Sequence, residues 1–175
     1  NPNDDTSYLR VVNFPARGIG ARTVEQLQDA ARASGRSLCQ SVGAVAGKGG
    51  GNLAAFNALI ERLREDTRGA TLREIIEAVL QRSSLTEFYR HEKEGQDRLE
   101  NLDELVNAAE AFVTQEGFGK DAVALPVDEQ APGAIAGGAP LPPEALAPDA
   151  ETGEIVSPLA AFLTHAALEA GDNQA

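Results

Sequence analysis

The chain has 175 residues, of which 27 are acidic and 15 basic, and its formal net charge is −12. One cysteine cannot form a disulfide within the chain, and one cysteine with two histidines cannot complete a four-ligand Cys/His zinc site. No apolar stretch approaches the ~20 residues that a membrane-spanning helix needs, and no secretory leader opens the chain. We therefore expect a cytoplasmic protein with no membrane partner.

Apolar residues recur with helical spacing through most of the chain, and no run alternates as a strand would. In chain order, these stripes lie within 24–31, 53–63, 72–80, 99–113 and 159–167. Thr71 and Glu74 have the spacing of a capping box, and Ser157 before Pro158 is typical of a helix start. The pattern predicts an all-α fold, in the form of a compact multi-helix domain.

Two stretches interrupt the helical spacing. The glycine-rich residues 47–51 are expected to form a flexible connection between helices. Residues 118–155 contain six prolines with many alanines and glycines, which predicts a long irregular or disordered insertion. The chain would then consist of a helical body over 1–117, a flexible acidic segment over 118–155 and a closing helix over 156–175. That helix is expected to pack back on the body and bury Phe162 and Leu163.

The charge is distributed unevenly along the chain. Residues 1–98 contain 13 acids and 14 bases, whereas residues 99–175 contain 14 acids and one base, Lys120. The second part would repel nucleic acid, so any site for an anion is expected in the first part.

Several residues that resemble chemical sites have simpler explanations. The stretch 43–49 is one residue short of a phosphate-binding loop between its glycines, lacks the Ser/Thr that would hold magnesium, and follows no predicted strand. We expect His91 at a solvated helix end, His165 in a packing contact and Cys39 as a small buried hydrophobe with no base partner. The chain is therefore expected to contain no catalytic, cofactor-binding or metal-binding residue, and not to hydrolyse ATP.

The most specific signal lies between Asn13 and Val24. Pro15 would end a first helix, and Thr23 would open a second. Two glycines two residues apart allow a tight hairpin between them, with an apolar residue tucked beneath it. Its outward N–H groups would coincide with the positive end of the second helix, which suits a phosphate. The predicted DNA-backbone-binding residues are Arg17, Gly18, Ile19, Gly20, Arg22 and Thr23.

Such a hairpin would grip the DNA backbone without reading base edges, so it would bind without sequence specificity. The structural alternative is a glycine turn that only joins two helices. We expect Gly18→Val together with Gly20→Val to abolish duplex binding without unfolding the domain.

The hairpin segment resembles the helix-hairpin-helix DNA-binding motif. More narrowly, residues 10–23 (RVVNFPARGIGART) are similar to a segment of UvrD/Rep/PcrA-type superfamily 1 DNA helicases. The opening residues 1–5 (NPNDD), the stretch 98–105 (RLENLDEL) and the closing stretch 158–171 (PLAAFLTHAALEAG) resemble the same family in the same order. The segment between the last two stretches is longer than this family leads us to expect.

This resemblance implies that the chain is the 2B subdomain of an ATP-dependent 3′-to-5′ DNA helicase of repair or replication. The parent would use ATP and Mg²⁺, bound by motifs outside this chain. The subdomain would hold duplex DNA near a single-strand junction, contact the motor domains and possible repair proteins, and swivel to regulate unwinding. The implied location is bacterial, cytoplasmic and nucleoid-associated.

Two other functions remain open from the sequence. In the first, the acidic part binds a partner protein and the hairpin is only a turn, so that the chain has no DNA affinity. In the second, the chain is a helix-hairpin-helix DNA glycosylase. Such enzymes resemble this chain at the hairpin but place a catalytic Lys or Asp soon after it. Here no Lys occurs before Lys48, and Asp29 lies inside the second predicted helix.

Overall fold

A computed structural model of the chain describes residues 3–118, 122–124, 135–136, 139–140, 147–148 and 155–172. The described residues form α1 (Asp5–Val11), α2 (Ala21–Ser34), α3 (Leu38–Ser41), the 3-10 turn η1 (Val42–Ala44), α4 (Gly47–Asp66), α5 (Leu72–Arg82), α6 (Leu85–His91), α7 (Gly95–Gln115) and α8 (Pro158–Asp172). The prediction of an all-α fold is confirmed. Between α7 and α8 lie two antiparallel pairs of two-residue strands, β1 (Ile135–Ala136) with β2 (Ala139–Pro140) and β3 (Ala147–Pro148) with β4 (Ile155–Val156).

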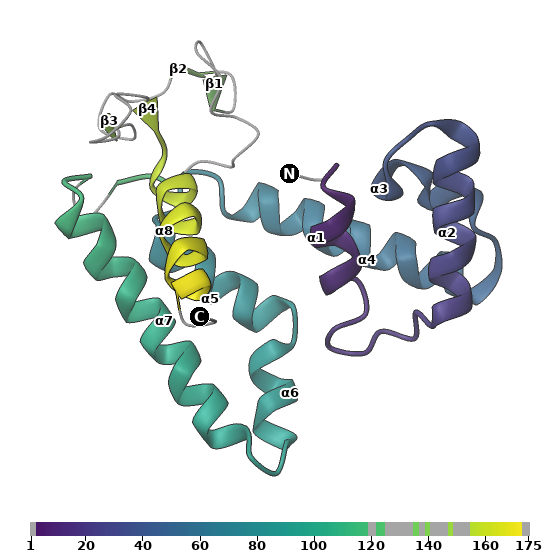
Figure 1. The fold of residues 1–175 in the computed structure, drawn as a ribbon, viewed down its shortest axis with the longest axis horizontal. Coiled ribbons are helices and arrows are strands. Elements are labelled where there is room, and N and C mark those ends of the chain that lie inside the picture. Colours follow the sequence, from purple (N-terminus) through teal and green to yellow (C-terminus); the bar gives the residue numbers. More distant parts are fainter. Residues whose placement is uncertain are drawn as a thin grey trace.

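The helices gather into two lobes, and α4 runs from one to the other (Figure 1). We call α1, α2, α3, η1 and residues 47–60 of α4 the first lobe, because their buried side chains form one core cluster. We call α5, α6, α7, α8 and residues 118 and 122–124 the second lobe, which contains a separate cluster. None of the helices in the described part of the chain has both the length and the apolar character needed to cross a bilayer.

The core of the first lobe is closed. The side chains of Ile19, Leu27 and Leu53 are at most 1% exposed. Tyr8 packs edge-on against Phe56 with ring centroids 5.5 Å apart. The Tyr8 hydroxyl, which the core surrounds, donates a hydrogen bond of 2.8 Å to Asn57 Oδ1. The apolar stripes of α2 and α4 therefore meet in a core that α1 covers.

The core of the second lobe lies where α5, α7 and α8 meet. Phe162 of α8 is buried and packs edge-on against Phe112 of α7, with ring centroids 5.5 Å apart. The expectation that Leu163 is buried as well is wrong, because its side chain is 51% exposed. Adjacent helical residues point about 100° apart, so the residue after Phe162 turns away from α7.

Part of the segment predicted to be flexible belongs to this core. Phe118, Ala122 and Ala124 are buried in it, and the Ala124 N–H donates to the Ala70 carbonyl at 2.9 Å. Most other residues of the predicted flexible segment over 118–155 lie outside the described residues.

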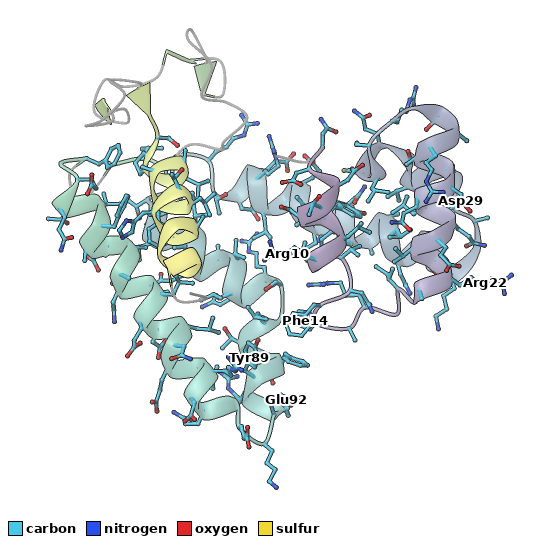
Figure 2. All side chains as sticks on the ribbon, in the orientation of Figure 1. Arg10, Phe14, Arg22, Asp29, Tyr89 and Glu92 are labelled. Carbon is cyan, nitrogen blue, oxygen red and sulfur yellow. The ribbon has the colours of Figure 1, made fainter. Side chains whose placement is uncertain are left out.

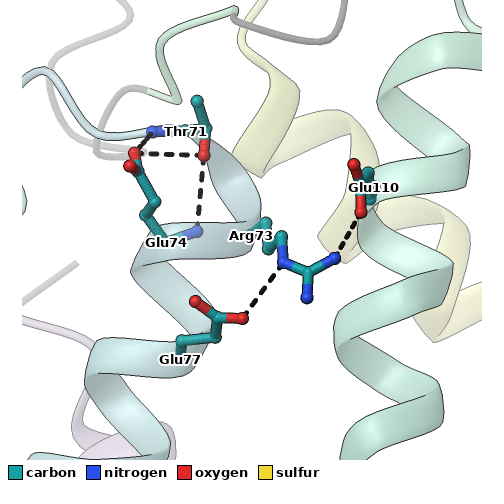
Figure 3. A network of polar contacts seen from close by, with 5 residues as sticks. All are labelled: Thr71, Arg73, Glu74, Glu77 and Glu110. Carbon is teal, nitrogen blue, oxygen red and sulfur yellow. Dashed lines mark hydrogen bonds and ion pairs between the residues drawn. The ribbon is translucent and has the colours of Figure 1, made fainter.

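The start of α5 is fixed by the predicted capping box (Figure 3). The Glu74 carboxylate accepts a hydrogen bond of 2.8 Å from the Thr71 N–H, and the Thr71 hydroxyl accepts one of 3.4 Å from the Glu74 N–H. In the same first turn of α5, Arg73 forms ion pairs with Glu77 and with Glu110 of α7. This network connects α5 to α7 on the surface of the second lobe.

The prediction of a flexible connection at residues 47–51 is wrong, because these residues form the first turn of α4. Glycine is needed there for close packing rather than for flexibility. A Cβ atom on Gly50 would lie 1.8 Å from the Val45 carbonyl oxygen, and one on Gly49 would lie 2.4 Å from Thr23 Oγ1. The glycines therefore let the start of α4 approach both the preceding chain and α2.

Candidate nucleic-acid interface

The predicted hairpin lies between α1 and α2, and a side chain of α4 forms a hydrogen bond to it. Gly18 has φ +71°, a left-handed conformation that favours glycine. The Asn52 side-chain amide on α4 donates a hydrogen bond of 3.0 Å to the Gly18 carbonyl. Ile19 is 1% exposed and belongs to the first-lobe core, as predicted for the residue under the hairpin. The hairpin is thus anchored by an apolar side chain and a side-chain amide.

Asn13 closes the hairpin at its base. Its Oδ1 atom accepts hydrogen bonds from the N–H groups of Arg17, at 2.8 Å, and of Ile19, at 3.1 Å. These two amides are therefore used within the protein and are not available to a ligand. Sequence reasoning missed Asn13 and Asn52, although an asparagine is a frequent partner of turn backbone because its side chain mimics a peptide group.

The N–H groups that remain without an acceptor, which we call the open amides, lie just after the hairpin, at the start of α2. Gly20 is the N-cap and contributes no side-chain hydrogen bond to the helix. The N–H groups of Ala21, Arg22 and Thr23 have no acceptor among the described residues. Gly20 has φ −81°, and a Cβ atom placed on it would meet nothing within 4 Å. Three N–H groups at the positive end of a 14-residue helix therefore have no acceptor among the described residues, and Gly20 beside them is exposed.

The two glycines of the hairpin tolerate substitution differently. A Cβ atom on Gly18 would lie 2.8 Å from Asn52 Nδ2, and its positive φ strains any L side chain. Valine at Gly18 is therefore expected to lower the stability of the hairpin, and whether the double valine variant keeps its fold stays a prediction. A substitution at Gly20 alone changes the surface above the amides without either conflict.

The start of α4 packs directly against the start of α2. Thr23 lies against Gly49, so its hydroxyl is directed toward α4 rather than into solvent, and its side chain is half-buried. α4 also lacks a side-chain cap, and Lys48 in its first turn is exposed. Two uncapped helix starts therefore lie side by side in the first lobe.

The two arginines of the motif have different surroundings. Arg22 is exposed at the outer end of α2 (Figure 2) and has no ion pair or hydrogen bond among the described residues. Arg17 is half-buried, and its guanidinium donates to main-chain carbonyls, including that of Ser83 at 3.1 Å. Burial lowers the pKa of Arg17. The structure thus leaves Arg22 accessible to a ligand and engages Arg17 within the protein.

The described residues contain no group of three or more His, Cys, Asp and Glu side chains that could hold a metal ion. Cys39 is half-buried beside the first-lobe core, and burial raises the pKa of its thiol, so the reactive thiolate is disfavoured. His91 ends α6 in an exposed position, and the His165 ring packs 5.2 Å from that of Phe112.

Comparison with known proteins agrees with the motifs. No family model matches the chain. DNA helicase II of Escherichia coli is 33% identical over 183 residues, which cover the whole chain and 21% of the helicase. DNA helicase II of Haemophilus influenzae is 33% identical over the whole chain and 20% of its own length. ATP-dependent DNA helicase PcrA of Bacillus subtilis is 34% identical over 119 residues, or 64% of this chain and 16% of PcrA.

The class of protein that the comparisons indicate is therefore the one its motifs predicted: the whole all-α chain is similar to one part of DNA helicase II, and 64% of it is similar to one part of PcrA, so it corresponds to a fragment of the UvrD/PcrA-type DNA helicases. More particularly, the relatives that it matches along its whole length are DNA helicase II proteins. The chain spans about a fifth of the length of these relatives.

Proposed function

We propose that this chain is the 2B-type subdomain of an ATP-dependent 3′-to-5′ DNA helicase of repair or replication, and that its hairpin holds duplex DNA near a single-strand junction. The observation that carries the proposal is the start of α2, where three N–H groups have no acceptor among the described residues and the neighbouring Gly20 is exposed. The match to DNA helicase II supports DNA as the partner.

A phosphate fits the chemistry of this site. The uncapped N–H groups are hydrogen-bond donors at the positive end of a helix, and such an end attracts an anion. Arg22, which is exposed beside them, adds a full positive charge. All these donors would reach only the DNA backbone, so binding would be independent of sequence and would weaken as salt increases.

The charge of the first lobe suits this role. Residues 3–60 contain six basic and four acidic side chains, although the whole chain has a net charge of −12. In this proposal the first lobe faces DNA, and the acidic second lobe faces solvent or another domain.

The remaining parts of the proposal concern the parent protein. ATP and Mg²⁺ would bind to motor domains outside this chain, because the residues here do not fit a nucleotide. The glycine-lysine stretch begins α4 and has no Ser or Thr after its lysine. The partners would be duplex DNA, those motor domains and repair proteins, on the bacterial nucleoid.

Fluorescence anisotropy with a short labelled duplex, over a series of salt concentrations, tests the proposal. We expect a dissociation constant of roughly 10⁻⁴ to 10⁻⁶ M near physiological salt, which is the usual range of non-specific binding. The affinity should fall steeply as salt increases and should not depend on the sequence of the duplex.

The variant Gly20→Asp separates binding from folding. An aspartate at the N-cap satisfies the open amides and stabilises the helix start, but it places a negative charge where the phosphate would bind. We expect the free energy of unfolding to stay the same or rise slightly, while duplex affinity falls at least tenfold. Gly43→Asp is the matched control, because Gly43 is also exposed with nothing within 4 Å of an added Cβ atom.

Two results would contradict the proposal. If Gly43→Asp weakens binding as much as Gly20→Asp does, net charge alone controls affinity and the hairpin has no special role. If the folded chain fails to bind duplex even at low salt, the alternative function is favoured, in which the acidic part binds a partner protein. Capture of a partner that depends on residues 99–175 would then support that alternative.

A further inference from the structure

The guanidinium of Arg17 is surrounded by main-chain carbonyls from both lobes. Nη2 donates a hydrogen bond of 3.1 Å to the carbonyl of Ser83 in the second lobe. Nη1 donates to the carbonyls of Val11 at 3.0 Å, Val12 at 3.4 Å, Phe14 at 3.0 Å and Pro15 at 3.1 Å. One side chain therefore connects the segment leading into the hairpin with a residue 66 positions away.

Three of the five acceptors lie at the ends of two helices. Val12 is the C-cap of α1, and Ser83 is the C-cap of α5. The carbonyls of a last helical turn have no partner within the helix and form the negative end of its dipole, which attracts a cation. Arg17 thus neutralises the negative ends of two helices that belong to different lobes.

The Arg17 guanidinium is bound within the protein. Arg17 is half-buried, it forms no ion pair with a carboxylate among the described residues, and its guanidinium lies 5.1 Å from the centroid of the Phe56 ring. A planar guanidinium can donate to acceptors on two sides at once, whereas a lysine ammonium cannot reproduce that fork. The N–H groups of the Arg17 guanidinium donate to main-chain carbonyls of the two lobes.

An aromatic contact lies at the same junction. Phe14, which follows α1, packs edge-on against Phe88 of α6 with ring centroids 5.2 Å apart, and its centroid lies 6.5 Å from that of Tyr89. Figure 2 shows Phe14 and Tyr89 next to each other between the two lobes. The hairpin segment is therefore held to the second lobe at two neighbouring points.

We propose that Arg17 is a positioning residue that fixes the orientation of the phosphate-binding hairpin relative to the second lobe. This inference rests on the proposed function of the hairpin. It assigns to Arg17 an effect on DNA affinity that requires no contact with DNA.

Two variants distinguish positioning from direct contact. Arg17→Lys keeps the charge but loses the fork, and Arg17→Gln loses both. We expect both variants to weaken duplex affinity by a similar factor of about ten, because the segment leading into the hairpin loses the hydrogen bonds to its carbonyls that hold it in place. The dependence of affinity on salt should keep the wild-type slope, because the number of phosphate contacts is unchanged. The control Arg22→Gln should instead reduce that slope by about one.

The orientation of the lobes can be measured without DNA. Residual dipolar couplings of backbone amides report the direction of α2 relative to α5 in the wild type and in Arg17→Lys. We expect the two helices to change their relative orientation or to lose a single fixed one, while far-UV circular dichroism stays unchanged. If Arg17→Lys unfolds, Phe14→Ala serves instead, because Phe14 is 47% exposed and loosens the same junction at little cost to the core.

Two outcomes would overturn the proposal. One is that Arg17→Lys restores wild-type affinity while Arg17→Gln lowers the salt slope by one, which would make Arg17 a direct phosphate contact. The other is an unchanged orientation of α2 and α5 in the folded variants. A wild-type chain that does not bind DNA would contradict the proposed function alone, since the dipolar couplings would still decide whether Arg17 positions the hairpin.

Discussion

The two lobes differ in how their helices pack. The first lobe has a closed core and short connections, and glycines bring the starts of α2 and α4 into direct contact. In the second lobe no such contact between helix starts is present among the described residues, and both lobes leave some apolar side chains partly exposed, such as Val11 at 48% in the first lobe and Leu163 at 51% in the second. The lobe in which two helix starts are in contact is also the one that presents the N–H groups without acceptors, so this contact supports the proposed binding site.

The lobes also differ in charge. Residues 72–118 contain 11 acidic and five basic side chains, in contrast to the excess of basic side chains in residues 3–60. Surface ion pairs such as Arg73 with Glu110 join helices within the second lobe. The difference indicates that the second lobe is unsuited to a polyanion and suited to contact with water or a protein.

The largest expected effect tests the tight packing of the first lobe. Gly50→Ala would place a Cβ atom 1.8 Å from the Val45 carbonyl oxygen, so backbone must move. We expect a loss of about 3 kcal/mol or more in the free energy of unfolding, measured by urea denaturation. Gly51→Ala, whose Cβ atom would meet nothing within 4 Å, should stabilise the same helix by roughly 0.5–1 kcal/mol. Equal effects of the two substitutions would show that residues 47–51 do not form a packed helix start.

A pair of truncations compares a core side chain of the first lobe with a partly exposed side chain of the second. Leu27→Ala removes a side chain that is 0% exposed in the first lobe, and it should cost about 3 kcal/mol of unfolding free energy. Val79→Ala in the second lobe should cost less than about 1 kcal/mol, because its side chain is already 41% exposed. Both values come from denaturation curves of the purified variants. Similar losses would mean that a surface outside the described residues covers Val79.

The capping box supplies a smaller effect, within the second lobe. Thr71→Ala removes the side-chain acceptor at the start of α5, and we expect it to cost about 1 kcal/mol. Thr114→Ala is the control, since its exposed hydroxyl bonds only to the Glu110 carbonyl within α7 and alanine favours a helix more. Denaturation should rank Thr71→Ala well below Thr114→Ala in stability. The reverse order would show that α5 does not depend on its cap.

The smallest expected effect is a loss of stability at alkaline pH that is confined to the first lobe. Burial, and to a lesser extent Cys39, raises the pKa of Tyr8 above the ordinary tyrosine value of about 10. The neutral phenol is favoured in the fold, so its contribution is complete below about pH 10 and is lost as the pH rises further. Amide hydrogen exchange should show the first lobe opening before the second as the pH rises. Tyr8→Phe should weaken this dependence, and an unchanged dependence would exclude Tyr8 as its cause.

Much of the fold could be predicted from periodic patterns. The apolar stripes located α2, α4, α5, α7 and α8, because burial of one helix face imposes its spacing on the sequence. The Gly-Ile-Gly segment located the hairpin, since a positive φ at Gly18 and a buried Ile19 are local requirements.

The errors arose where tertiary contacts decide a residue's role. Composition suggests flexibility at residues 47–51, but Gly49 and Gly50 are there because Thr23 and Val45 approach them. Arg17 has the charge that suits a phosphate contact, and only the meeting of the α1 and α5 ends shows where its guanidinium donates. Neither the close glycine contacts nor the meeting of the two helix ends produces a residue spacing that could have been recognised in the sequence.

The 20 residues of α4 form one uninterrupted helix, about 30 Å long, that contributes to the core of the first lobe and contacts α5 of the second lobe. A helix of this kind transmits rotation as well as distance. Adding or removing one residue between the lobes would turn one lobe by about 100° around the α4 axis relative to the other and separate Arg17 from Ser83. The length of α4 therefore sets the angle between the lobes. Surface residues of either lobe can be substituted freely, but the number of residues between the lobes is constrained.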